Sequence, residues 1–292
     1  MNTAKLNPLE NQEDALPLKK KKQYKALLPL RTDQTVKDQF QFTPLSVLEP
    51  TKESKKKWES LGAYLDVAER RRSENCEYLP GLKFSEFHAG LTENIVKYWS
   101  VEGDSIVDPF CGRATRAFVS SSLNRKYQGY EVSPLTHQRV EAHLLKHNLT
   151  AQVHLEDGCK LNQTADSSVD LVMTCPPYYT LEVYEEAPEQ LSRLPDYASF
   201  LNKVDECAKN CFRVLRSGKF CAWVVADFRH KGKFLSFSSD CISSFKTAGF
   251  NHWDTIIIKN FSPFAALQMG KVASKRYTSK IHEFLLVFRK PE

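Results

Sequence analysis

The sequence predicts an α/β protein in which helices cover both faces of a mostly parallel sheet. From about residue 84 onward, short apolar runs alternate with amphipathic segments of helical length. The apolar runs are nearly continuous, whereas strands exposed on one face would alternate apolar and polar residues. Continuous apolar strands separated by helices are typical of a parallel sheet that is buried on both sides.

The first half of this region alternates regularly between the two kinds of element. Ser133 is a suitable N-cap, and Pro134 fits the first position of a helix, so a helix is predicted from there to about residue 147. Another helix is expected directly after the first strand. The expected strands are 105–107, 126–132, 151–155 and 169–173, and the expected first helix is 114–123.

The second half contains the strongest helical pattern of the chain. From Tyr197 to Leu215 apolar residues recur at 3.6-residue spacing, and Gly218 is expected to end this helix. A further helix is expected over 237–247. The expected strands are 220–226, 253–258 and 284–288.

Three regions are expected along the chain. Residues 1–40 are polar and lysine-rich and predict a flexible basic extension. Residues 41–80 predict a helical N-terminal segment. Its apolar residues from Trp58 to Val67 indicate a helix that ends before Arg70. Residues 81–292 form the main domain.

Charge and cysteine content narrow the function classes. The net charge is +6, and basic residues gather at 19–22, 55–57, 70–72 and 271–280, a distribution compatible with nucleic-acid phosphates. No apolar run approaches the roughly 18 residues that a membrane span needs. The N-terminus lacks a signal-peptide pattern, and the eight cysteines show no paired spacing. A cytoplasmic protein with reduced thiols is therefore expected.

Two short loops are the strongest candidates for a ligand-binding site. Asp108-Pro109-Phe110-Cys111-Gly112 and Thr174-Cys175-Pro176-Pro177-Tyr178-Tyr179 each follow an expected strand, and parallel sheets bind ligands at the carboxyl ends of their strands. The glycine of the first loop allows close approach of a nucleotide-like cofactor, and the next helix N-terminus suits a carboxylate.

Acidic residues end two further strands. Glu131 lies 19 residues after Gly112, near the offset of about 20 at which an acid reaches ribose hydroxyls. Asp157 could accept a hydrogen bond from an adenine amino group. The missing Gly-x-Gly-x-x-Gly pattern argues against a dinucleotide-binding dehydrogenase.

The second loop is stiff because two prolines fix φ and remove two N–H donors, which leaves its carbonyls free to accept. A hydrogen bond from a base amino group to such a carbonyl would draw the nitrogen toward tetrahedral geometry. Tyr178 would stack on a base extruded from the duplex.

These loops resemble those of the S-adenosylmethionine-dependent DNA amino-methyltransferases, which act on cytosine N4 or adenine N6. Residues 108–115 are similar to the family's Asp-Pro-Phe-x-Gly-x-Gly-Thr loop, and 174–178 look like its Thr-Ser-Pro-Pro-Tyr form, which is common among cytosine-N4 enzymes. Residues 181–200 look most like phage-type members. The resemblance covers about residues 80–290.

The resemblance implies a Rossmann-like class I methyltransferase fold with seven strands, S-adenosylmethionine as cofactor, DNA as partner and a bacterial or phage-infected cell. It implies no metal, and with DNA as the partner the helical segment 41–80 is a candidate DNA contact. The implied cofactor-binding residues are Phe87, Asp108, Phe110, Gly112, Thr115, Glu131 and Asp157, and the implied catalytic residues are Cys175, Pro176, Pro177 and Tyr178.

Three departures from the family's pattern matter, and two of them, Arg113 and Cys175, leave alternatives open. Ala114 replaces the second loop glycine but is small, so cofactor binding is expected to be kept. Arg113 beside it is bulky and charged, and a pairing with the methionine carboxylate is one role for it. Cys175 stands where the family has Asp, Asn or Ser, and a thiol is a weak acceptor. Methylation of an RNA base amino group and a non-catalytic nucleic-acid-binding relative are the alternative functions. Attack of Cys175 on pyrimidine C5 is an alternative chemistry.

Overall fold

The computed structural model describes residues 44–65, 87–179, 189–259 and 269–292. These residues belong to a compact unit that extends from Thr43 to Glu292. The predicted extension 1–40, the basic residues at 19–22 and 70–72, and the 181–188 part of the phage-type likeness lie outside the described residues. Within the described ranges, every helix is too short or too polar to cross a bilayer.

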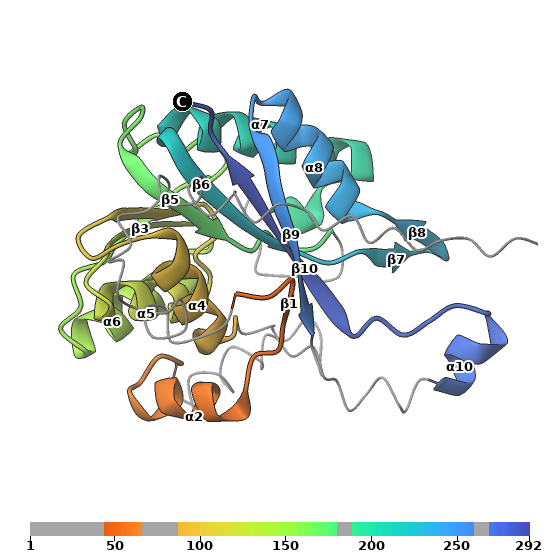
Figure 1. Ribbon diagram of the computed structural model, residues 1–292, viewed down its shortest axis with the longest axis horizontal. Helices are drawn as coiled ribbons and strands as arrows, with labels where there is room; N and C mark the ends of the chain where they lie inside the picture. Colours follow the sequence, from red (N-terminus) through yellow and green to blue (C-terminus); the bar gives the residue numbers. More distant parts are fainter. Residues whose placement is uncertain (1–43, 66–86, 180–188, 260–268) are drawn as a thin grey trace, which may run out of the picture. The chain divides into compact units, whose positions relative to one another are not determined.

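An eight-stranded sheet organises the unit (Figure 1). The predicted fold class is confirmed, since all neighbouring strands are parallel except that β10 is antiparallel to both of its neighbours. In spatial order the strands are β1 (Val47–Leu48), β9 (Asn251–Lys259), β10 (His282–Arg289), β6 (Leu215–Val225), β5 (Val169–Thr174), β2 (Ser105–Asp108), β3 (Lys126–Glu131) and β4 (Gln152–Leu155). The strand beyond the expected seven is β1, whose two residues are too few to show a pattern.

Helices lie on both sides of the sheet. In Figure 1, α4, α5 and α6 gather on one side, and α7 and α8 lie on the other. The helices are α2 (Lys52–Ser60), α4 (Ala89–Trp99), α5 (Thr115–Ser122), α6 (Pro134–Lys146), α7 (Tyr197–Val214), α8 (Phe237–Thr247) and α10 (Met269–Ser274). A 3-10 turn, η2 (Leu191–Arg193), precedes α7. Ser133 caps α6 by accepting from the Thr136 N–H, as predicted.

The N-terminal helix differs from the prediction. It spans Lys52–Ser60 and ends well before Leu65, because Gly62 adopts a φ of 92° that a helix cannot contain. The expected helix through Leu65 is therefore wrong, although Tyr64 and Leu65 are buried. The Trp58 indole donates to Glu93 of α4 at 2.6 Å, which holds α2 on α4.

The amphipathic pattern of α7 is confirmed, but its predicted end is wrong. The helix stops at Val214, and β6 begins at the next residue. Gly218, the expected end of the helix, lies within β6 at a φ of 74°. Its N–H donates to the Lys290 carbonyl at 3.0 Å, so pairing with the end of the chain replaces a helical continuation.

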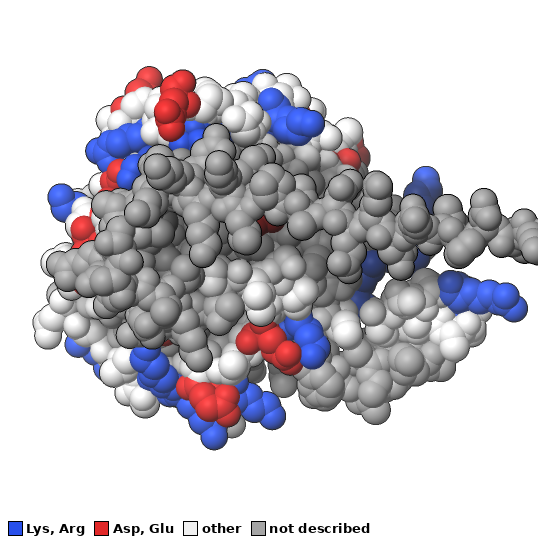
Figure 2. Space-filling view, in the orientation of Figure 1, with Lys and Arg blue, Asp and Glu red and all other residues white. Residues whose placement is uncertain are grey.

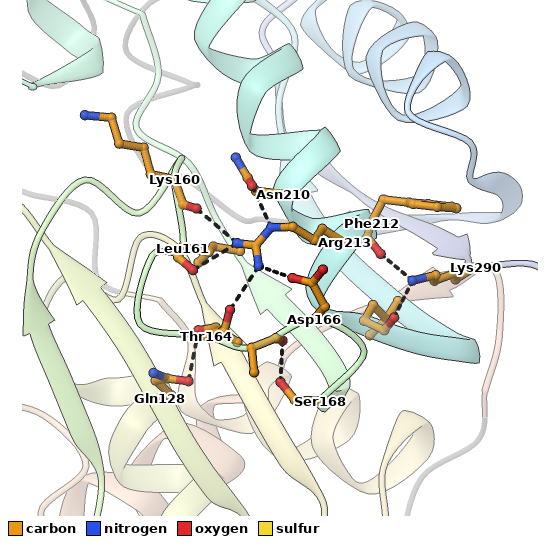
Figure 3. Close-up of polar contacts among 12 residues, drawn as sticks. Gln128, Lys160, Leu161, Thr164, Asp166, Ser168, Asn210, Phe212, Arg213 and Lys290 are labelled. Atoms are coloured by element: carbon orange, nitrogen blue, oxygen red, sulfur yellow. Dashed lines mark hydrogen bonds and ion pairs between the residues drawn. The ribbon is translucent and has the colours of Figure 1, made fainter.

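Arg213 fixes the loop that joins β4 to β5 (Figure 3). Its guanidinium donates to three loop carbonyls and to the Asp166 carboxylate at 2.6 Å. The carbonyls belong to Lys160, Leu161 and Thr164. One side chain thus satisfies several backbone acceptors at once, which holds the segment after Asp157 against the end of α7.

The hairpin of β7 (Phe228–His230) and β8 (Lys233–Leu235) extends beyond β6 as a separate two-stranded sheet. The sequence did not predict it, because each strand has three residues and the segment is rich in cations.

Candidate active site

The two loops identified in the sequence leave the sheet side by side. Their strands, β2 and β5, are parallel neighbours in which Val107 pairs with Val172. Asp108 and Thr174 are the last residues of these strands. The cofactor loop, residues 109–114, and the catalytic loop, residues 175–179, therefore begin at the same edge of the sheet.

Asp108 joins the two loops directly. One carboxylate oxygen accepts from the Thr174 hydroxyl at 2.5 Å and from the Phe110 N–H at 3.0 Å. The other accepts from Arg116 at 2.6 Å and from the Tyr127 hydroxyl at 2.7 Å. Asp108 and Thr174 are both fully buried. These four bonds use the carboxylate within the protein, so its contribution to a cofactor site is to fix the shape of the loop.

Arg116 is the partner that sequence reasoning missed. It lies in the first turn of α5, pairs with Asp108, donates to the Phe110 carbonyl, and has the ring of Phe87 at 4.8 Å from its guanidinium carbon. Burial acts to lower the pKa of Arg116, but the Asp108 carboxylate outweighs it and the pKa is raised. A charged residue beside the apolar Ala117 and Phe118 was the available signal, since a buried charge needs a buried partner.

The backbone of the cofactor loop is strongly bent. Gly112 has a φ of 56° and Ala114 a φ of 66°, so Ala114 keeps the left-handed conformation for which a glycine is better suited. A Cβ built on Gly112 would meet only the Phe110 carbonyl oxygen, at 3.9 Å. Ala114 is the N-cap of α5 and provides no side-chain cap. The loop therefore places an open glycine just before a helix N-terminus that has no side-chain cap.

Glu131 ends β3 beside this loop. Its carboxylate accepts from the Ser133 N–H at 2.9 Å and from the backbone of Val132 and Gly112. Burial raises the pKa of Glu131 to about 7, and the nearby Asp108 adds to the shift, while the backbone donors oppose it. Because burial has removed water from this carboxylate, hydrogen bonds from new donors, such as a pair of hydroxyls, would stabilise its charged form.

Asp157 follows β4 and is nearly buried. One oxygen accepts from the Cys159 N–H at 3.0 Å and the other from Lys203 of α7 at 3.0 Å. The next residue, Gly158, touches the cofactor loop so closely that a Cβ there would lie 1.8 Å from the Pro109 carbonyl oxygen. The loop after β4 and the cofactor loop are thus packed against each other through backbone atoms.

The catalytic loop divides into exposed and buried parts. Pro176 and Tyr179 are buried, whereas Cys175, Pro177 and Tyr178 are partly accessible. The Cys175 thiol lies 4.0 Å from the Pro176 carbonyl oxygen, a weak contact. Tyr179 packs among aromatic rings of the core, including Phe200 at 5.5 Å.

Tyr178 is held at both ends of its side chain. Its hydroxyl donates to Glu283 at the start of β10 at 2.8 Å, and its ring lies 6.4 Å from that of Phe228. Phe110 of the cofactor loop packs on the core cluster to which Tyr178 also belongs. The predicted residues on the two loops, together with Phe87 and Glu131, therefore lie at one edge of the sheet. Thr115 is the first residue of α5, the helix that follows the cofactor loop.

Comparison with known proteins agrees with this arrangement. The DNA methylase family, of the N6 and N4 type, matches residues 2–141 and 169–292. This chain belongs to that family. Membership implies S-adenosylmethionine as the cofactor, and the fit is supported by the open face of Gly112, the uncapped α5 and the carboxyl of Glu131.

Individual relatives are more distant. The orphan methyltransferase M.BamHII of Bacillus amyloliquefaciens is 30% identical over 125 residues, which are 43% of this chain and 40% of that enzyme. Among solved structures, the cyclase SpnF has 17% identity and a TM-score of 0.51 over 70% of this chain and 82% of its own. A putative DNA modification methylase of Thermus thermophilus has 25% identity and a TM-score of 0.34 over 45% of this chain and 49% of its own.

Gly112→Ala should weaken S-adenosylmethionine binding more than it weakens the fold. The left-handed φ costs alanine about 1 kcal/mol of stability, and the new methyl enters the space in front of the loop. Gly103→Ala is the matched control, because Gly103 has a φ of 85° with nothing within 4 Å of its Cβ position. Thermal unfolding and calorimetric titration should give similar stability losses but reduced cofactor affinity only for Gly112→Ala.

The raised pKa of Glu131 predicts a pH-dependent stability. Its folded-state pKa of about 7 exceeds the usual 4.5, so its contribution is complete at low pH and is lost as pH rises from about 4.5 through 7. Urea unfolding of wild type and Glu131→Gln should show wild type losing roughly 2–3 kcal/mol relative to the variant across this range. Parallel pH curves for the two proteins would contradict the shift, and Glu102→Gln, an exposed position, is the control.

Proposed function

We propose that this protein transfers a methyl group from S-adenosylmethionine to an exocyclic amino group of a DNA base, with cytosine N4 favoured over adenine N6. The observation that carries the proposal is the 2.5 Å bond between Thr174 and Asp108. It sets the Pro-Pro-Tyr loop beside the glycine loop, so that donor and acceptor of a methyl group would meet at one edge of the sheet. Family membership supports the same chemistry.

The cofactor would be held mainly by backbone and by acids at strand ends. The N-terminus of α5, which begins at Thr115 and has no side-chain cap, suits the methionine carboxylate, and the open face of Gly112 leaves room for it. Glu131 suits the ribose hydroxyls, and Asp157 the adenine amino group, with Lys203 as its existing partner. The rings of Phe87 and Phe110 would border the methionine part. When bound, the cofactor supplies an electrophilic sulfonium methyl.

The base would be positioned by the catalytic loop. Tyr178 offers a partly accessible ring whose hydroxyl is already held by Glu283, so the ring is oriented before a base arrives. The loop carbonyl of Pro176 would accept a hydrogen bond from the base amino group and direct the nitrogen lone pair toward the methyl. The preference for cytosine N4 rests on the likeness of 174–178 to the Thr-Ser-Pro-Pro-Tyr form.

Labelled methyl transfer to duplex DNA, single-stranded DNA and RNA, followed by nucleoside mass spectrometry, tests the proposal. N4-methylcytosine in DNA is the expected product, and N6-methyladenine would retain the reaction but reverse the base preference. Label found only in RNA would mean that the substrate is an RNA base rather than a DNA base. Label as 5-methylcytosine would make Cys175 a nucleophile. An absence of both label and cofactor binding would indicate a non-catalytic binding protein.

Tyr178→Ala should lower the methyl-transfer rate about 10- to 100-fold, because base–aromatic stacking contributes about 1–3 kcal/mol. Tyr178→Phe is the matched variant: it keeps the ring, loses the bond to Glu283, and should retain most of the rate. Cofactor affinity should stay near wild type in both variants. Equal losses in affinity and rate for Tyr178→Ala would contradict the stacking role.

A further inference from the structure

A basic surface extends from the catalytic loop along the β7–β8 hairpin. It consists of six cations from two segments that contain no acidic residue, 228–235 and 273–282. We call it the basic face and define it as Arg229, Lys231, Lys233, Lys275, Arg276 and Lys280, all of which are exposed. In Figure 2, the visible charged atoms around the hairpin and beyond α10 are mostly those of Lys and Arg.

Aromatic rings contact two of the cations of the basic face, Arg229 and Lys280. The Arg229 guanidinium carbon lies 4.5 Å from the Tyr277 ring centroid and 5.3 Å from that of Phe234. The Lys280 ammonium lies 4.7 Å from the same Phe234 ring. Rings and cations thus alternate and join the hairpin to the segment before β10. Phe234 remains 40% exposed, so the rings belong to the surface.

Both segments of the basic face adjoin residues that contact Tyr178. Phe228, which contacts the Tyr178 ring, is the first residue of β7. Glu283, which accepts from the Tyr178 hydroxyl, follows the other segment. Because a strand rises about 3.3 Å per residue, Lys231 lies only about 10 Å along the chain from Phe228, a distance of roughly three base steps.

We propose that the basic face binds the phosphate backbone of duplex DNA on one side of the target base. The inference rests on the proposed function, since it assumes that the base bound by Tyr178 belongs to DNA. Isolated surface lysines are common, but here six exposed cations come from two segments without acids, two of the cations lie over aromatic rings, and both segments adjoin the candidate base site. This arrangement suits a contact with a phosphate backbone. The bound cations would release counterions from the DNA, which makes the affinity depend on salt.

The test compares two triple variants of the full chain. The first, Lys231→Ala with Lys233→Ala and Lys275→Ala, removes three exposed cations of the basic face without touching the ring contacts. The matched control, Lys126→Ala with Lys146→Ala and Lys209→Ala, removes three exposed lysines from β3, α6 and α7. Binding to a labelled duplex of about 30 base pairs is measured from about 50 to about 300 mM salt, with calorimetric S-adenosylmethionine binding as the check of folding.

The first variant should bind duplex DNA at least about 10-fold more weakly at about 0.1 M salt. The slope of log K against log salt should fall by about 3, one for each lost phosphate contact. Cofactor affinity and the control variant should match wild type. Equal DNA binding by both triple variants would overturn the basic face but leave the proposed function. A wild type that neither binds nor methylates DNA, or that binds only RNA, would overturn both.

Discussion

The buried carboxylate of Asp108 is the constraint on which the site depends. Burying a carboxylate without partners would cost much folding free energy, so the burial of Asp108 requires its hydrogen-bond and ion-pair partners. Those partners come from four places: the loop after β2, the end of β5, the first turn of α5, and β3. The same ion therefore shapes the glycine loop, orients the start of the following helix, and aligns the strand that carries the Pro-Pro-Tyr loop. The buried carboxylate of Asp108 thus positions the two loops between which the ligands would bind.

Contacts other than the bonds of Asp108 hold Asp157 and Tyr178 in place. Gly158 packs its backbone against Pro109, and Arg213 donates to the carbonyls of the loop that follows, so the region of Asp157 is packed between the cofactor loop and the end of α7. Tyr178 depends instead on Glu283 and Phe228, which lie at the other side of the catalytic loop. The part proposed to hold the cofactor is thus built on packed backbone, and the part proposed to hold the base is built on side chains.

The sequence predicted the sheet because buried parallel strands need continuous apolar runs, and it predicted the two loops because turns and rigid hinges need glycine and proline. It did not predict Arg116 as a partner of Asp108, since their separation along the chain says nothing of pairing across a turn into a helix. Thr174 was expected only as the first residue of the Pro-Pro-Tyr loop, and the bond from its hydroxyl to Asp108 could not be foreseen before β2 and β5 were known to be neighbours. The expected role of Gly218 was wrong because its conformation serves pairing with Lys290, a residue far away in the sequence. The roles of the individual site residues remain predictions.

A double-mutant cycle on Asp108→Asn and Thr174→Val tests most directly whether this one bond holds the two loops in register. Single-turnover methyl transfer to DNA and cofactor affinity are measured for wild type, both single variants and the double variant. If the bond couples the loops, each single variant loses transfer rate and the double variant loses little more than the worse of the two. If the losses in log rate simply add, the two loops act independently, and the account of Asp108 as their common support is contradicted.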